Sequence, residues 1–325
     1  MKKIFITGGA GYVGSVLIPI LLEKNFQVIS YDLMIYGQTL PENDNLKIVK
    51  GDIRNQELLE KNISGSDIVI HLACISNDPS FELNPKLGKS INLDAFEPLV
   101  KISKKNNVQR FIYASSSSVY GIKKDKNVYE DMTLEPLTDY SKFKADCEKI
   151  LYKHSSSDFV TTVIRPATVC GYSKRQRLDL VVNILTNLGY HNKLIKVLGG
   201  SQLRPNIHIY DMCMSYLKVM EVPKDLVNKQ AFNVGFENHS VLDLAKLVKQ
   251  NLDETVKIMQ MESNDQRSYH VSSEKIRKLL HFNPSKNIED AVKDLINAFS
   301  KNIFSDTLNN QFYYNIKRMN NINLT

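Results

Sequence analysis

The sequence lacks several features that mark nucleic-acid-binding proteins. Tryptophan is absent from the 325 residues, and no zinc-finger spacing or aromatic run typical of an RNA-binding sheet occurs. The formal net charge is +7, but the lysines are scattered and form no long basic block. We therefore expect no nucleic-acid partner, and a positive charge of this kind also suits small phosphorylated ligands.

Cysteine is scarce, and its spacing excludes the common structural metal sites. The four cysteines lie far apart and form no C-x-x-C pair: Cys74, Cys147, Cys170 and Cys213. This spacing argues against a structural zinc site, so no metal is expected. A reduced, cytoplasmic setting is consistent with it.

Long apolar runs are also missing. No stretch of 18 apolar residues occurs, so no membrane span is expected. The N-terminal segment "MKKIFITGGAGYVGSVLIPILL" has two lysines before an apolar run, as a signal peptide does. Four glycines interrupt that run and no small-residue cleavage site follows, so we interpret it as part of the fold.

What the sequence does contain is a regular alternation of short apolar runs and amphipathic segments. Helices are predicted over residues 13–25, 93–107 and 138–154. Strands are predicted over residues 2–8, 27–32, 46–52, 66–73, 110–116 and 160–167. Strands separated by helices of this length build a parallel sheet that is covered on both faces.

After residue 166 the alternation is less regular. We expect helices over 178–191, 240–252, 272–282 and 288–303, a strand over 193–199, and a return to the sheet over 207–222 and 230–235. Residues 305–325 are polar apart from Phe312, Tyr313 and Tyr314, and predict a tail that either docks through these aromatic rings or remains loose. The expected domains are a nucleotide-binding domain, 1–167 with about 206–234, and a smaller substrate domain, about 168–205 with 235–304.

A glycine-rich segment, "TGGAGYVG" at 7–14, follows the first predicted strand and opens the first helix. Gly9, Gly11 and Gly14 match the pattern G-x-G-x-x-G, while Gly8, Gly11 and Gly14 match G-x-x-G-x-x-G. Glycines let backbone N–H groups approach a diphosphate, and the helix dipole favours the anion. Asp32 ends the second strand, where its carboxylate would bind the adenosine ribose and repel a 2′-phosphate. The pattern predicts a Rossmann-type, doubly wound sheet that binds NAD in preference to NADP.

A tyrosine and a lysine stand four residues apart in "YSKFK", at 140–144. In a helix, Tyr140 and Lys144 would share one face. Free tyrosine has a pKa near 10, too high for a base at neutral pH. A neighbouring ammonium and an oxidised nicotinamide would favour the phenolate, which could then take a proton from a sugar hydroxyl. Such a pair also occurs by chance, so the surrounding motifs decide its meaning.

Several motifs occur in one order along the chain: "TGGAGYVG" (7–14), Asp32, "GDIR" (51–54), "HLAC" (71–74), "SSSSVYG" (115–121), "YSKFK" (140–144) and "RPATVCG" (165–171). Together they resemble the motifs of the extended short-chain dehydrogenase/reductase family. The resemblance is to its nucleotide-sugar epimerase/dehydratase branch, of which UDP-glucose 4-epimerase is the best-known member. The resemblance continues through "GSQLRPNIHIYD" (200–211), "FNVG" (232–235) and "DQRSYHVSSEKIRKLLHF" (265–282), and so covers the chain to about residue 300.

The resemblance implies roles for individual residues. Tyr140 would be the catalytic base, Lys144 would also hold the nicotinamide ribose, and the Ser116 hydroxyl would bind the reacting oxygen. The implied cofactor-binding residues are Gly8, Gly11, Tyr12, Val13, Gly14, Asp32, Asp52, Ile53, Leu72, Ala73, Cys74, Asn92, Ser115, Tyr140 and Lys144. The implied substrate-binding residues are Ser116, Tyr140, Thr168, Arg204 and Arg267, of which the two arginines would clasp the nucleotide diphosphate.

Departures from the family pattern favour one reaction. Nucleotide-sugar 4,6-dehydratases carry an Asp-Glu pair after the catalytic Ser or Thr, and here Ser117 and Ser118 occupy these positions. Without that pair, water elimination has no obvious proton carrier. We therefore expect a nucleotide-sugar 4-epimerase that transiently oxidises and re-reduces C4. The family resemblance implies a homodimer. The alternatives are a C4 oxidase or 4-keto reductase, a 4,6-dehydratase with other acids, and a non-catalytic NAD-binding sensor or scaffold.

Overall fold

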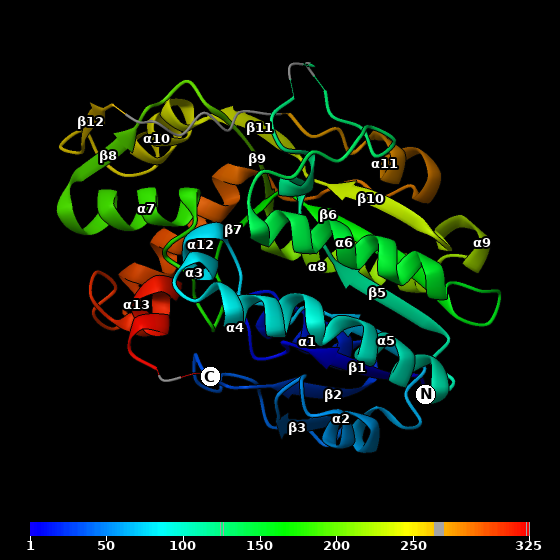
Figure 1. Cartoon of the computed structure of the whole chain (residues 1–325). Coiled ribbons are helices and arrows are strands. Elements are labelled where there is room, and N and C mark those ends of the chain that lie inside the picture. The colour runs from blue at the N-terminus through cyan, green and yellow to red at the C-terminus, as the bar shows by residue number, and fades with distance from the viewer. Residues whose placement is uncertain (124, 126, 263–269, 323, 325) are drawn as a thin grey trace.

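The computed structural model describes residues 1–123, 125, 127–262, 270–322 and 324. A seven-stranded sheet forms its centre, with strand order β10-β6-β5-β4-β1-β2-β3 (Figure 1). All six pairings in this sheet are parallel, as predicted. The strands are β1 (Lys3–Thr7), β2 (Gln27–Asp32), β3 (Leu46–Lys50), β4 (Ile68–His71), β5 (Arg110–Ala114), β6 (Val160–Pro166) and β10 (Gln230–Val234).

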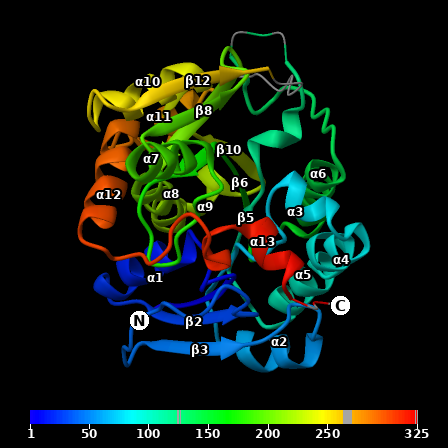
Figure 2. The same cartoon turned by 90° about the vertical axis from the view of Figure 1, so that its left-hand side faces the viewer.

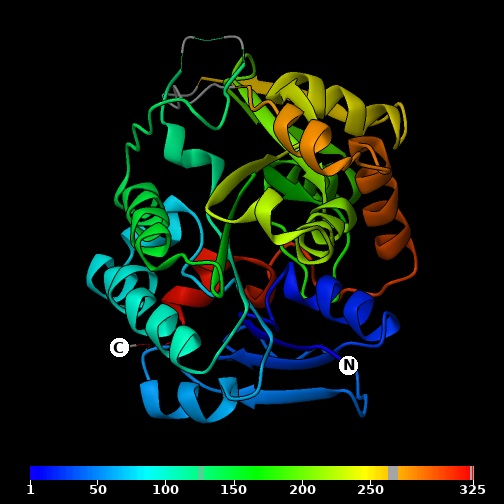
Figure 3. The same ribbon diagram turned by 90° about the vertical axis from the view of Figure 1, so that its right-hand side faces the viewer.

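Helices cover both faces of the sheet (Figure 3). On one face lie α1 (Gly14–Glu23) and α8 (Ile209–Glu221), and on the other α2 (Gln56–Ile63), α5 (Phe96–Lys105) and α6 (Asp139–His154). Successive strand residues point to opposite faces, so Ile4 and Ile6 join the first core while Phe5 joins the second. The predicted fold class, a doubly wound α/β sheet, is confirmed.

A smaller part of the chain lies beyond the carboxyl ends of the strands of the seven-stranded sheet and has its own hydrophobic core. Helices α7 (Val181–Asn192), α10 (Val241–Gln250) and α12 (Ile288–Ser300) pack with a parallel pair, β8 (Leu194–Leu198) and β12 (Lys257–Met261). A three-stranded sheet connects this part to the rest, in the order β11 (Glu237–Ser240), β9 (Leu203–His208), β7 (Thr168–Cys170). The shorter helices are α3 (Asp78–Glu82), α4 (Pro85–Lys89), α9 (Lys224–Val227) and α11 (Glu274–Leu280), with η1 (Ser90–Asp94), η2 (Ser117–Tyr120) and η3 (Gln311–Tyr313).

The prediction for residues 207–222 was wrong. Only β10 returns to the large sheet, whereas Ile209–Glu221 forms helix α8. Its buried residues recur at helical spacing, as Met212, Tyr216 and Met220 show, and they pack on the same core as α1. Helix α2 and strand β12 were not predicted. Asn55 had offered a signal for α2, because its side chain caps the helix by accepting from the Leu58 N–H.

The segment after α12 docks on the molecule and ends in helix α13 (Asn315–Asn320). Tyr313 and Tyr314 pack against a small core that includes Leu178 and Phe304, and the Leu178 N–H donates to the Tyr313 carbonyl at 2.9 Å. Phe312 remains 38% exposed. Of the two predicted alternatives for the tail, the structure shows the docked one. Figure 2 shows α13 between the smaller part of the chain and strands β2 and β3.

Candidate active site

A cavity of about 430 Å³ opens at the carboxyl edge of the large sheet, between the sheet and the smaller part of the chain. The chain builds β1, β2 and β3 in one direction and then returns to place β4 on the other side of β1. Adjacent loops therefore diverge above β1 and β4, and open α/β sheets bind ligands at such a point. The cavity is lined from the ends of β1, β2, β4 and β5, from residues 166–180, and from the C-terminal segment.

The glycine-rich loop is packed directly on the end of β4. Gly8 has a φ of +74°, and a Cβ at this position would lie 2.6 Å from the Ala73 nitrogen. A side chain would therefore force β1 and β4 apart. The side chain of Tyr12 leaves the loop, and its hydroxyl donates to the Gly171 carbonyl at 2.7 Å. The loop thus presents backbone to the cavity at the start of α1, which fits the diphosphate of a dinucleotide.

Asp32 lies at the end of β2 and lines the same cavity. Its carboxylate accepts from the backbone N–H groups of Met34 at 2.7 Å and of Ala10 at 3.1 Å. Burial raises the pKa of Asp32, and these two donors oppose that shift. The two hydrogen bonds fix the carboxylate at the position expected for a ribose ligand.

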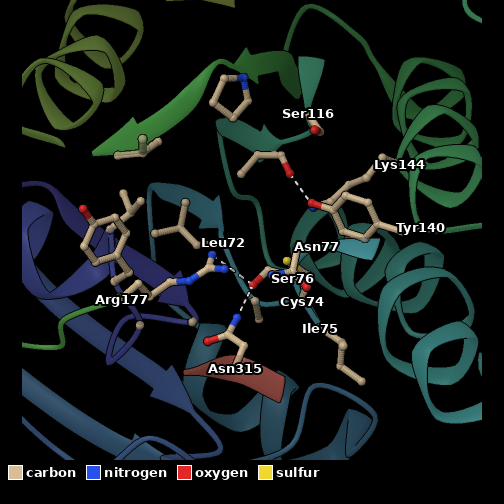
Figure 4. Close-up of a pocket in the computed structure, with 18 of the residues that line it drawn as sticks. Leu72, Cys74, Ile75, Ser76, Asn77, Ser116, Tyr140, Lys144, Arg177 and Asn315 are labelled. Atoms are coloured by element: carbon tan, nitrogen blue, oxygen red, sulfur yellow. Dashed lines mark hydrogen bonds between the residues drawn. The ribbon is translucent and has the colours of Figure 1, made fainter. Parts of the chain in front are cut away.

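Tyr140, Lys144 and Ser116 are brought together at the other end of the cavity (Figure 4). Thr138 caps helix α6, so that Tyr140 lies in its first turn and Lys144 one turn later. The Lys144 ammonium lies 5.8 Å from the centroid of the Tyr140 ring and donates to the Ala114 carbonyl at 2.7 Å. Ser116 caps the short helix η2 and hydrogen-bonds Tyr140.

Burial raises the pKa of Tyr140 above its ordinary value, as do Cys74 and Asp78. The expectation that an oxidised nicotinamide beside the Lys144 ammonium favours the phenolate concerns the cofactor-bound protein and stays a prediction. The groups that lower this pKa are Arg177 and the hydrogen bond from Ser116. In the cofactor-free protein, burial therefore favours the protonated phenol of Tyr140.

The remaining predicted residues divide into two groups. Residues that line the cavity as expected are Gly8, Gly11, Tyr12, Val13, Gly14, Ile53, Leu72, Ala73, Cys74, Ser115, Thr168 and Arg204. Asp52 instead pairs with Arg54 at 2.6 Å. Asn92 lies behind the wall, where its amide donates to the Ile75 carbonyl and accepts from the Ile75 N–H, both at 2.9 Å. Arg267 lies outside the described residues.

The sequence analysis did not predict five further polar residues that line the cavity: Tyr36, Ser76, Arg175, Arg177 and Asn315. A signal for the two arginines was available in the short basic segment "KRQR" (174–177), which begins two residues after "RPATVCG" ends. The contribution of Asn315 had no such signal, because it comes from the tail.

The described part of the chain holds no group of three or more His, Cys, Asp and Glu side chains arranged to bind a metal ion. No helix in that same part combines the length and apolarity that crossing a membrane requires.

Comparison with known proteins agrees with this geometry. Residues 4–235 match the model of the NAD dependent epimerase/dehydratase family. The chain belongs to this family. It is therefore an enzyme, and its cofactor is NAD, as the sequence predicted.

The relatives include both expected reaction types. The chain is 29% identical over 314 residues to a protein of Bacillus subtilis described as an uncharacterized UDP-glucose epimerase, covering 90% of this chain and 96% of the relative. It is 28% identical over 326 residues to the dTDP-D-glucose 4,6-dehydratase of Bos taurus, covering 93% and 89%. Among solved structures, the UDP-glucose 4-epimerase of Thermotoga maritima has the same fold, with a TM-score of 0.84, 24% identity and coverage of 93% and 100%.

Proposed function

We propose that the protein is an NAD-dependent nucleotide-sugar 4-epimerase, which inverts C4 of an NDP-hexose or related sugar. The observation that carries this proposal is the set of side chains beside Tyr140. Ser116, Ser117 and Ser118 line the cavity there, and no carboxylate occupies the two positions after Ser116. Hydroxyl groups can orient a C4 oxygen, but a serine has too high a pKa to act as acid or base without an activating partner.

Bound NAD supplies the acceptor and donor of the hydride that C4 loses and regains. Tyr140 takes the proton from the C4 hydroxyl and later returns it. Ser116, already hydrogen-bonded to Tyr140, holds the reacting oxygen in line with the phenol. The positive charge of Lys144 lies 5.8 Å from the Tyr140 ring and stabilises the negative charge that develops on the phenol oxygen.

The relatives named UDP-glucose epimerases make UDP-hexoses the first substrates to test. Incubation with a panel of UDP- and dTDP-sugars in deuterated water, followed by NMR, separates the candidate reactions. A 4-epimerase gives a product inverted at C4 with no solvent deuterium at C5 or C6. Deuterium at C5, or a 6-deoxy-4-keto product, would contradict the proposal.

The same experiment with Tyr140→Phe tests the base. This change keeps the ring and removes the proton acceptor, and we expect turnover to fall by about 10²-fold or more, the usual scale for a general base. NAD bound to the variant, measured by absorbance after denaturation, should equal that of the unaltered protein. Near-normal turnover would remove Tyr140 from the mechanism.

A 4,6-dehydratase is the second candidate, because one carboxylate does reach this end of the cavity. Asp78 lines the cavity, accepts from the Thr138 hydroxyl at 2.5 Å, and raises the pKa of Tyr140. It could serve as the acid that the serine pair does not provide. Asp78→Asn distinguishes the two reactions, since it should abolish elimination and leave C4 inversion within about tenfold.

A further inference from the structure

Residues 171–177 are fastened to the glycine-rich loop. The Tyr12 hydroxyl donates to the Gly171 carbonyl at 2.7 Å, and the Ser173 hydroxyl donates to the Tyr12 carbonyl at 2.9 Å. The Asn183 amide donates to the Tyr12 hydroxyl at 3.0 Å. These three hydrogen bonds fix the position of residues 171–177 relative to the glycine-rich loop at the rim of the cavity.

This segment carries two buried arginines that line the cavity, Arg175 and Arg177. Their exposed fractions are 4% and 9%. Arg175 donates from Nη2 to Asn315, but its Nε and Nη1 have no partner. Arg177 donates from Nε to Asp179, while its Nη2 has none. Buried guanidinium N–H groups are costly when unpaired, so their number and direction indicate a ligand with several acceptor atoms.

The surroundings of the two arginines locate that ligand. The Arg175 guanidinium lies 3.7 Å from the centroid of the Tyr36 ring and interacts with Asp32, at the ribose end of the cavity. Arg177 donates to Ser76 at 3.4 Å and lowers the pKa of Tyr140, at the nicotinamide end. The pair thus spans the middle of the dinucleotide cleft, where Figure 4 shows Arg177 across from Tyr140. A dinucleotide carries its diphosphate at its middle.

Asn315 holds this arrangement from the C-terminal segment and is 1% exposed. Its side chain accepts from Arg175 Nη2 at 2.8 Å and donates to Ser76 at 2.9 Å. Its backbone N–H donates to Asp179 at 3.0 Å. In the next turn, Arg318 donates to the carbonyl of Ile35, in the loop that follows Asp32.

We propose that Arg175 and Arg177 form a binding site for the diphosphate of NAD, opposite the glycine-rich loop, and that Asn315 positions Arg175 in that site. The backbone N–H groups of the loop would bind one side of the diphosphate and the guanidinium forks the other. Both negative charges would then be neutralised away from water. This proposal concerns the cofactor only and holds or fails independently of the sugar reaction.

The test measures binding by isothermal titration calorimetry to protein freed of cofactor, with NAD, ADP and adenosine as probes. For Arg175→Gln and for Arg177→Gln we expect Kd to rise about tenfold or more for NAD and for ADP, the scale of a charge-assisted hydrogen bond. Adenosine, which lacks the diphosphate, should bind as to the unaltered protein. Lys174→Gln is the matched control: it removes an exposed positive charge from the same segment, and all three affinities should be unchanged.

Asn315→Ala tests the positioning role through its coupling to Arg175. Alone it should weaken NAD several-fold, and added to Arg175→Gln it should weaken NAD no further, because its effect passes through Arg175. Additive losses would contradict that role. If Arg175→Gln fails to fold, Arg175→Lys, which keeps the charge and loses the fork, should bind NAD at an intermediate affinity.

One outcome would assign the site to the other diphosphate in the reaction. UDP titrated into the NAD-loaded protein should bind equally to the unaltered protein and to Arg175→Gln. If UDP is weakened tenfold while NAD is not, the arginines bind the nucleotide sugar and the proposal is overturned. Unchanged binding of every probe would overturn it as well.

Discussion

Arg165 and Arg175 are both 4% exposed, yet the protein treats the two charges in opposite ways. Every guanidinium nitrogen of Arg165 has a partner. Nε and Nη2 donate to Glu148 at 3.1 and 2.7 Å, and Nη1 donates to the Tyr120 hydroxyl at 2.7 Å and to the Glu130 carbonyl at 3.1 Å. Arg175, in contrast, has one such bond and a tyrosine ring.

The difference separates a structural charge from one kept for a ligand. The pair of Arg165 and Glu148 ties strand β6 to helix α6, and Glu148 lies one turn after Lys144. This network fixes the helix that carries Tyr140. Removing one member of a fully hydrogen-bonded buried ion pair leaves the other charge unpaired. An arginine with unpaired N–H groups, in contrast, still has donors available for another molecule.

Arg165→Met should have the largest effect on stability. It leaves the Glu148 carboxylate buried, with the Ser115 hydroxyl as its remaining hydrogen-bond donor among the residues that the structure describes. Breaking such a buried pair typically costs about 3–5 kcal/mol. Urea denaturation followed by circular dichroism gives the free energy of unfolding. The double variant Arg165→Met with Glu148→Leu should recover part of the loss. A loss below about 1 kcal/mol for the single variant would contradict this account of the network.

His71 extends the contrast to a buried base that the fold keeps neutral. It is 2% exposed, its Nδ1 lies 2.7 Å from the Thr7 hydroxyl, and burial with the nearby Lys144 lowers its pKa to about 3. The unfolded chain takes up this proton near pH 6.5, so the contribution to stability is present above that pH and is lost as the pH falls.

Between pH 7 and pH 5 the unaltered protein should therefore lose about 2 kcal/mol more stability than His71→Gln does. Urea denaturation of both proteins at the two pH values measures this difference, in which the other titrating groups cancel. Equal losses would show that His71 is protonated in the folded protein.

Arg175→Met should have the smallest effect on the cofactor-free protein. An apolar side chain of similar length replaces a buried charge whose Nε and Nη1 are unpaired, so the free energy of unfolding should change by less than about 1 kcal/mol or should increase. The effect should grow when NAD is added, because the ligand stabilises the unaltered protein more. A destabilisation as large as that of Arg165→Met, without NAD, would erase the distinction between the two arginines.

Local patterns in the sequence predicted the large sheet and one side of the site. The alternation of strands and helices, the glycine-rich loop, Asp32 and the spacing of Tyr140 and Lys144 are each contained within a few residues, and parallel topology places the strand ends together. These signals do not depend on distant partners. The structure accordingly places the glycines, Asp32, Ser116, Tyr140 and Lys144 around one cavity.

The other side of the site could not be predicted because it depends on contacts between segments far apart in the chain. Asn315 reaches Ser76 across 239 positions and Arg175 across 140. No pattern within a few residues predicts a contact between segments so far apart in the chain. The raised pKa of Tyr140 has the same origin, since it comes from burial and from the nearby Cys74 and Asp78, which are distant from Tyr140 in the chain. The wrong prediction for residues 209–221 has a different cause, because the helical spacing of their apolar residues is itself a local signal that predicts the observed helix.

The hydrogen bond between Arg175 and Asn315 also has a consequence for the order of events during protein synthesis. All strands of the large sheet lie before residue 235, so they leave the ribosome well ahead of Asn315. A nascent chain at that stage can pair its strands while Arg175 still lacks its positioning partner. Translation that stops before residue 315 would accordingly release a chain with its sheet complete and its cofactor cleft unfinished.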